Sequence, residues 1–169
     1  PNFPKTAADY QIMDNNRAGG PCWDNMVDFV NGIVEMFDVG SSDSDARVSV
    51  VTFGKGAKVQ FTLKQHMSNA AVKAAISAIL WGERPQGTYT NEGLAAVDTA
   101  ATESQGMRSA SKSVPRVVLV VTDGKSSNTK HGKAQAAKLK AKGAKVFAIG
   151  VSGYNPDELK DLASAPSST

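Results

Sequence analysis

The stretch VVLVVTDG, residues 117–124, decides how the rest of the chain is interpreted. Its first five residues are apolar, and four of them are β-branched. Such a run ending in Asp-Gly is typical of a strand buried on both faces, as in a parallel sheet covered by helices. Ligands of these open sheets bind beyond the carboxyl ends of the strands, where Asp123 is expected. The alternative is that Asp123 and Gly124 only form the turn that ends the strand.

The composition fits one α/β domain. At 169 residues the chain is long enough for a sizeable core and too short for two, so we expect a single domain over residues 1–169. The formal net charge of +3 gives no indication of nucleic-acid binding, and no run approaches the roughly 18 apolar residues of a membrane span. Cys22 is the single cysteine, which excludes an internal disulfide; a packed small side chain and a reactive thiol both stay open for it. The start at Pro1, without a signal-peptide pattern, suggests a processed or excised fragment.

Strand-like and helix-like segments alternate along the chain. Apolar and β-branched runs predict strands at residues 9–13, 47–53, 58–63, 117–123 and 145–151. Apolar residues spaced by three and four predict helices at residues 23–37, 69–80, 91–103, 130–142 and 156–163. In this pattern Phe37 and Leu80 face the core, and Gly143 ends the fourth helix. The alternation predicts a doubly wound, mostly parallel sheet with one antiparallel edge strand and helices on both faces.

Three loops carry oxygen-bearing side chains that should meet at the carboxyl end of the sheet. They offer Asp14 and Asn16 after the first strand, Thr88 before the third helix, and Asp123 after the buried strand. Carboxylate, amide and hydroxyl oxygens from separate loops suit a hard divalent cation such as Mg²⁺. The sequence therefore predicts a candidate cation site there.

The same segments resemble the conserved blocks of the von Willebrand factor A family. The matching blocks follow the family's order over nearly the whole chain: DNNRA at 14–18, GTYT at 87–90, VLVVTDG at 118–124 and VFAIGV at 146–151. The first long helix followed by RVSVVTF is similar to the form found in matrilins and non-fibrillar collagens of animal extracellular matrix.

This resemblance implies a Rossmann-like fold with a metal-ion-dependent adhesion site on top. It implies a secreted, non-enzymatic domain of the extracellular matrix that binds collagen, another matrix protein or carbohydrate. Arg17, Tyr89 and Lys125 would then contact the ligand beside the metal.

Two features depart from the family's pattern. The family's first metal loop is Asp-x-Ser-x-Ser, whereas here Asn16 and Ala18 replace the serines. Asn16 can offer a carbonyl oxygen, but Ala18 has no hydroxyl and Arg17 adds positive charge, so we expect a degenerate site that binds Mg²⁺ weakly. The family also continues with another strand and a closing helix, so either this chain was cut at Thr169 or its sheet lacks one edge strand.

Other functions remain open. A structural spacer or self-association domain of a matrix protein would have a non-functional metal site. An intracellular subunit of an ATP-driven metal-insertion machine shares only the fold. Ser126 and Ser127 with His131 could suggest hydrolysis, but no nucleophile-elbow or oxyanion-hole motif accompanies them.

Charge is distributed unevenly along the chain. Residues 1–45 carry eight acidic and two basic side chains, whereas residues 125–145 carry seven lysines and no acid. In the helix predicted at 130–142 this pattern is typical of a solvated face. The alternative is a surface that binds a sulfated polysaccharide, formed by Lys133, Lys138, Lys140 and Lys142.

Overall fold

The computed structural model describes residues 21–80, 87–109, 111, 114–122, 125–151 and 154–165, without the side chains of residues 21 and 22. The strand predicted at residues 9–13 lies outside them. The chain divides into a first unit, Pro1–Val48 with His66–Glu83, and a second unit, Ser49–Gln65 with Arg84–Thr169. Among the described residues, no helix has both the length and the apolar character needed to cross a membrane.

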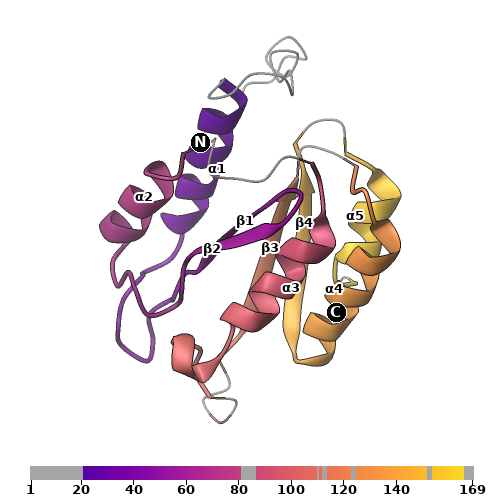
Figure 1. The fold of residues 1–169 in the computed structure, drawn as a ribbon. Helices are drawn as coiled ribbons and strands as arrows, with labels where there is room; N and C mark the ends of the chain where they lie inside the picture. Colours follow the sequence, from indigo (N-terminus) through magenta and orange to yellow (C-terminus); the bar gives the residue numbers. More distant parts are fainter. Residues whose placement is uncertain are drawn as a thin grey trace. The chain divides into compact units, whose positions relative to one another are not determined.

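The first unit is built around two helices, α1 (Pro21–Val34) and α2 (Asn69–Ser77), which contact each other (Figure 1). Val34, Val72 and Ile76 are buried, as their apolar spacing predicts. The Ser68 hydroxyl caps α2 by accepting a hydrogen bond from the Ala71 N–H at 3.2 Å.

Both helices of the first unit end earlier than predicted. The side-chain amide of Asn69 donates to the carbonyl oxygens of Val34 (2.9 Å), the last residue of α1, and of Phe37 (2.8 Å), which supports the turn that follows the helix. Phe37 is therefore outside the helix and 52% exposed, and Leu80 beyond α2 is 64% exposed. The prediction that these two side chains face the core was wrong.

All the strands that the structure describes lie in the second unit. Its elements, in chain order, are β1 (Val50–Phe53), β2 (Ala57–Phe61), α3 (Thr90–Ala100), the 3₁₀-helix η3 (Glu103–Gln105), β3 (Arg116–Thr122), α4 (Thr129–Ala141), β4 (Ala144–Gly150) and α5 (Pro156–Leu162). β1 and β2 form the predicted antiparallel hairpin, and β3 and β4 pair in parallel, with α4 as the connection between them. Gly143 lies just after α4 with φ +84°, which confirms it as the residue that ends the helix.

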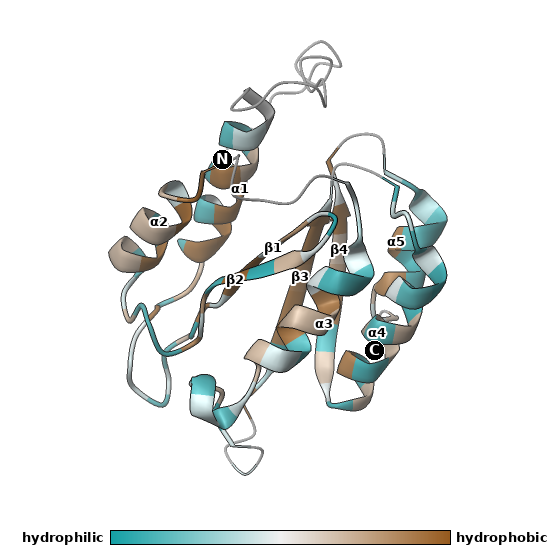
Figure 2. Ribbon diagram, viewed as in Figure 1, coloured by the Kyte–Doolittle hydropathy of each residue, from teal (hydrophilic) through white to brown (hydrophobic). Residues whose placement is uncertain are grey.

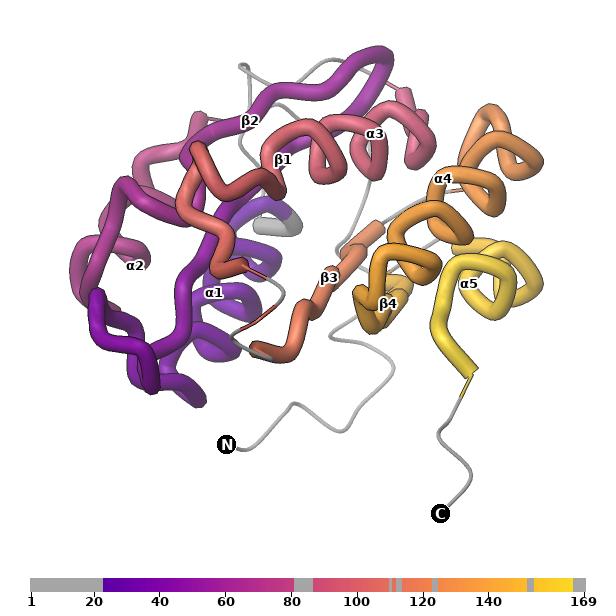
Figure 3. Tube along the Cα trace, turned by 90° about the horizontal axis from the view of Figure 1, so that it is seen from below, coloured from indigo at the N-terminus to yellow at the C-terminus, as the bar shows by residue number. Residues whose placement is uncertain are grey.

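The core of the second unit lies on one face of β3 and β4. Val120 and Val146 from the strands pack with Leu94 of α3, Leu139 of α4 and Leu162 of α5. Figure 2 shows β3 as strongly hydrophobic and the outer surfaces of α4 and α5 as mostly hydrophilic, and Figure 3 shows these helices side by side along β4.

The opposite face of this sheet is less buried than predicted. Side chains alternate between the faces of a strand, so Val117 and Phe147 point away from the core that contains Val146. Their exposed fractions are 60% and 45%. The prediction that the strand at residues 117–123 is buried on both faces was therefore wrong at Val117.

Candidate functional site

The turn before α3 is fixed to the end of β1. Gly87 has φ +92°, a left-handed conformation that glycine adopts without steric cost. Two residues later, the Tyr89 N–H donates to the carbonyl oxygen of Gly54 at 3.0 Å. This hydrogen bond holds Thr88 and Tyr89 beside the carboxyl end of β1.

The loop after β3 lies next to this turn. The Ser127 N–H donates to the main-chain carbonyl of Thr88 at 2.8 Å. At the same end of the sheet, the Val151 N–H after β4 donates to the carbonyl of Thr122 at 2.9 Å. Thr88 is half-buried, and its hydroxyl has no hydrogen-bond partner among the residues that the structure describes. The turn 87–90 and the loop 125–128 thus form one surface, which we call the loop face.

A buried carboxylate lies behind the loop face. Glu158 of α5 is 5% exposed, and its Oε2 accepts a hydrogen bond from the Ser126 N–H at 2.9 Å. Its Oε1 accepts from the hydroxyl of Thr90, the first residue of α3, at 3.4 Å. Burying a carboxylate is unfavourable unless donors compensate for the lost water, and here one comes from each loop-face segment.

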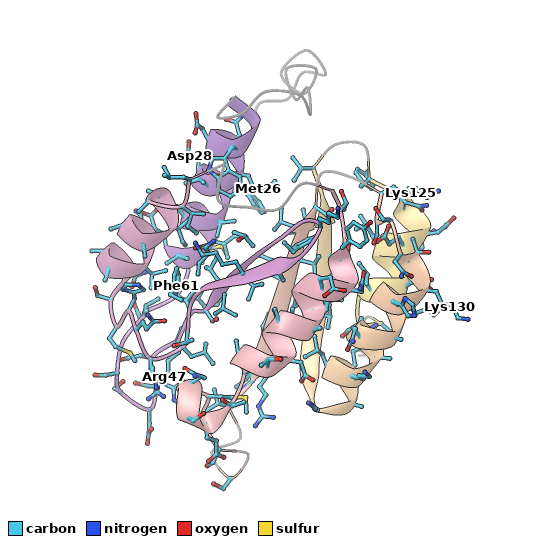
Figure 4. The ribbon with its side chains drawn as sticks, viewed as in Figure 1. Met26, Asp28, Arg47, Phe61, Lys125 and Lys130 are labelled. Atoms are coloured by element: carbon cyan, nitrogen blue, oxygen red, sulfur yellow. The ribbon has the colours of Figure 1, made fainter. Side chains whose placement is uncertain are left out.

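The structure describes three of the seven residues of the predicted site. Thr88 and Tyr89 lie in the turn and are half-buried, and Lys125 is exposed and projects outward, as does Lys130 (Figure 4). The other predicted site residues lie outside the described residues: Asp14, Asn16, Arg17 and Asp123. Within the described part of the chain, no group of three or more His, Cys, Asp or Glu side chains could hold a metal ion. The ligand roles of the seven residues therefore stay predictions.

Ser126 and His131 make contacts that hold the loop rather than contacts with each other. The Ser126 hydroxyl accepts from the Asn128 N–H at 3.2 Å, and Ser126 is 5% exposed. The His131 ring contacts the side-chain amide of Asn128, whose Oδ1 also caps α4 through the His131 N–H. Among the described residues, the Ser126 hydroxyl and the His131 ring therefore make no hydrogen bond with each other.

Three of the four lysines proposed as a polyanion surface have acceptors inside the second unit. Lys133 pairs with Asp161 of α5 and Lys142 with Asp98 of α3, each at 2.6 Å. The ammonium group of Lys140 donates to the carbonyl oxygen of Ala163 at 2.6 Å. Lys138 is exposed and has no such acceptor among the described residues. These contacts tie α4 to its neighbours, and polyanion binding stays a prediction.

Sequence reasoning did not identify Glu158 as part of the site. It lies three residues after Asn155, and Asn-x-x-Glu at a helix start already suggests a local capping box. The structure shows Asn155 capping α5 through the N–H groups of Asp157 and Glu158, while the Glu158 carboxylate contacts two distant segments. A usable signal was the spacing to Leu162: residues four apart share a helix face, and Leu162 is fully buried.

The sequence was compared with known protein families and with curated proteins. A family model described as the von Willebrand factor type A domain matches residues 15–169. Matrilin-3 of Homo sapiens is 32% identical over 159 residues, covering 92% of this chain and 31% of its own length. Matrilin-4 of Mus musculus is 38% identical over 140 residues, covering 82% of this chain and 22% of its own length. The chain therefore spans less than a third of either relative.

A solved structure agrees with the sequence comparison. Proximal thread matrix protein 1 from the mussel byssus, described with a zinc-occupied MIDAS motif, is similar with a TM-score of 0.76 and 29% identity. The match covers 84% of this chain and 36% of that one. The fold is the α/β fold of these proteins, and this chain belongs to the von Willebrand factor type A domain family.

Proposed function

We propose that this chain is a single, secreted, non-enzymatic adhesion domain of the extracellular matrix that binds collagen or another matrix protein through the loop face. Family membership and similarity to matrilins support a role in matrix adhesion. The hydrogen bond from the Ser127 N–H to the Thr88 carbonyl carries the proposal, because it joins two segments that the sequence assigned to one site. This bond uses the main-chain carbonyl of Thr88, and the Thr88 hydroxyl has no hydrogen-bond partner among the described residues.

A divalent cation such as Mg²⁺ is part of this proposal. Asp14, Asn16, Thr88 and Asp123 would hold it, and the ion would offer a coordination position to a carboxylate of the matrix ligand. The half-buried Thr88 hydroxyl fits an all-oxygen donor set. We expect weak binding, because Ala18 supplies no hydroxyl and Arg17 brings a positive charge. Arg17, Tyr89 and Lys125 would contact the bound ligand.

The test is binding to immobilised collagen, measured by surface plasmon resonance in Mg²⁺ and again in EDTA. We expect EDTA to abolish binding and Thr88→Val to weaken it by about tenfold or more, as the loss of a metal ligand does. Thr99→Val is the matched control: Thr99 lies near the opposite end of α3, and its hydroxyl donates to the Ala95 carbonyl within the helix. It should bind as tightly as the unchanged chain.

Restoring the family's serines tests the cation directly. The double substitution Asn16→Ser with Ala18→Ser should tighten Mg²⁺ binding in isothermal titration, because it adds the missing hydroxyl. Binding that ignores EDTA and Thr88→Val alike would contradict the adhesion-site proposal. That result would favour a spacer or self-association domain, which sedimentation velocity would then examine.

A sulfated polysaccharide is a second proposed partner, supported by the seven lysines without an acid at residues 125–145. Changing Lys133, Lys138, Lys140 and Lys142 together to Gln should lower retention on heparin, and added salt should lower retention of the unchanged chain. Glutamine preserves helix propensity, so lost retention would not reflect an unfolded α4. Equal retention of both chains would leave the lysines as a solvated surface.

A further inference from the structure

Glu158 is the one carboxylate among the described residues that is buried to this degree. Helix α5 brings it behind the loop face from a part of the chain that the site prediction did not include. Its two oxygen atoms contact different segments: Oε2 faces the Ser126 N–H of the loop after β3, and Oε1 faces the Thr90 hydroxyl at the start of α3. One side chain therefore bridges both halves of the loop face.

The donors that meet Glu158 are themselves buried. Thr90 is 1% exposed and Ser126 is 5% exposed, so water cannot easily replace the carboxylate as their acceptor. A buried N–H that loses its acceptor has a large desolvation penalty, and the segment that carries it moves to find another. Glu158 adds to the hydrogen bonds that the Tyr89 and Ser127 N–H groups make at this end, and it is the contact that connects both segments to α5, so its position constrains theirs.

The contacts of the carboxylate lie directly beside those that form the loop face. Thr90 is two residues after Thr88, and Ser126 precedes Ser127, whose N–H holds the Thr88 carbonyl. A shift of Ser126 therefore moves the donor that fixes Thr88. Glu158 is too buried to reach a macromolecular ligand, so it acts through these neighbours.

We propose that Glu158 is a positioning residue: its carboxylate sets the placement of Thr88 by holding Thr90 and Ser126 on either side of it. The proposal deepens the adhesion function and rests on it for its biological consequence. The positioning itself can be measured without any ligand. A carboxylate that only stabilised the fold would affect the whole unit equally.

The experiment compares three variants of the full chain. Glu158→Ala removes both acceptors. Glu158→Gln keeps an acceptor for the Ser126 N–H and offers an amide donor to the Thr90 oxygen. Asp161→Asn is the matched control, because it neutralises a carboxylate on the same helix that is about half exposed.

The first measurement is amide hydrogen exchange by NMR without divalent cation. We expect Glu158→Ala to accelerate exchange at Ser126 and Ser127 by about tenfold or more beyond the acceleration that its loss of global stability causes at Val120 in β3, because a charge-assisted hydrogen bond is lost locally. Glu158→Gln should restore much of the protection, and Asp161→Asn should leave it as it was. If Glu158→Ala does not fold, Glu158→Asp replaces it, since its shorter side chain cannot contact both donors.

The second measurement is Mg²⁺ titration by calorimetry on the same proteins. We expect Glu158→Ala to weaken Mg²⁺ binding by about tenfold, with Glu158→Gln binding more tightly than Glu158→Ala. Unchanged exchange at Ser126 and Ser127, or acceleration spread equally to Val120, would overturn the positioning role. Local acceleration in a chain that binds no Mg²⁺ would support the positioning role and contradict the metal site, so the two failures are distinguishable.

Discussion

Glu158 and Asp161 are carboxylates three residues apart on the seven-residue helix α5, and they differ in burial. Glu158 is 5% exposed and accepts from the Ser126 N–H at 2.9 Å, whereas the Asp161 side chain is 47% exposed and pairs with Lys133 at 2.6 Å. The shorter contact is the weaker one energetically, because water competes for both partners of the exposed pair and solvates them when they separate. Burial decides how much each carboxylate contributes to the stability of the fold. The loss of stability on substitution along α5 should therefore increase with the burial of the side chain, whatever its contact distance.

The largest effect is expected where α5 enters the core. Leu162 is fully buried against the other core residues, so Leu162→Ala should lower the free energy of unfolding by about 2–5 kcal/mol through lost burial and the remaining cavity. Urea denaturation followed by circular dichroism measures it. Leu80→Ala is the control, since Leu80 is 64% exposed and should change stability by no more than about 0.5 kcal/mol. Similar losses for the two would mean that Leu162 is not a core residue.

The buried carboxylate should come next. Glu158→Ala leaves the Ser126 N–H and the Thr90 hydroxyl without their acceptor, and we expect a loss of about 2–3 kcal/mol in the same denaturation experiment. Combining it with Thr90→Val should cost less than the sum of the two single substitutions, because both remove one shared contact. Strict additivity would show that the 3.4 Å contact between Thr90 and Glu158 carries no energy.

The cap of α5 should have an intermediate effect. Asn155 Oδ1 accepts from the N–H groups of Asp157 (2.9 Å) and Glu158 (3.3 Å), and Asn155→Ala should lower stability by about 1 kcal/mol. Asn155→Asp keeps the acceptor and should retain most of the stability. Equal losses for both substitutions would assign the role of Asn155 to something other than capping.

The smallest effect is expected at the exposed carboxylate. Asp161→Asn should change the free energy of unfolding by at most about 0.5 kcal/mol, and the difference should diminish as salt is added. The measurement is a series of urea denaturations from low to high ionic strength. A loss as large as that of Glu158→Ala would break the comparison between the buried and the exposed carboxylate of α5.

Local signals in the sequence predicted most elements of the second unit. The β-branched run of β3 and the glycine after α4 specify a strand and a helix end through interactions between residues close in the chain. The same signals located the ends of α1 and α2 less well. There, the Asn69 side chain donates to the Val34 carbonyl at the end of α1 from 35 residues away, which no local pattern reveals.

The candidate site was predictable only in outline. The rule that loops meet beyond the carboxyl ends of parallel strands put Thr88 near the loop after β3, and the structure joins the two through Ser127. The rule could not identify Glu158, because the rule concerns loops that follow strands and Glu158 lies on helix α5. It could not show that Lys133 and Lys142 have acidic partners, since those lie on other elements.

By itself, the sequence determined the order of the described strands and helices, the glycine that ends α4 and the family, because these depend on side-chain type and spacing along the chain. Only the tertiary structure decided which carboxylate of α5 is buried, which lysines are paired and which face of β3 is covered. Glu158 reaches Ser126 across 32 residues and Thr90 across 68. Contacts over such separations depend on how elements pack together, and that packing sets the burial on which their energies depend.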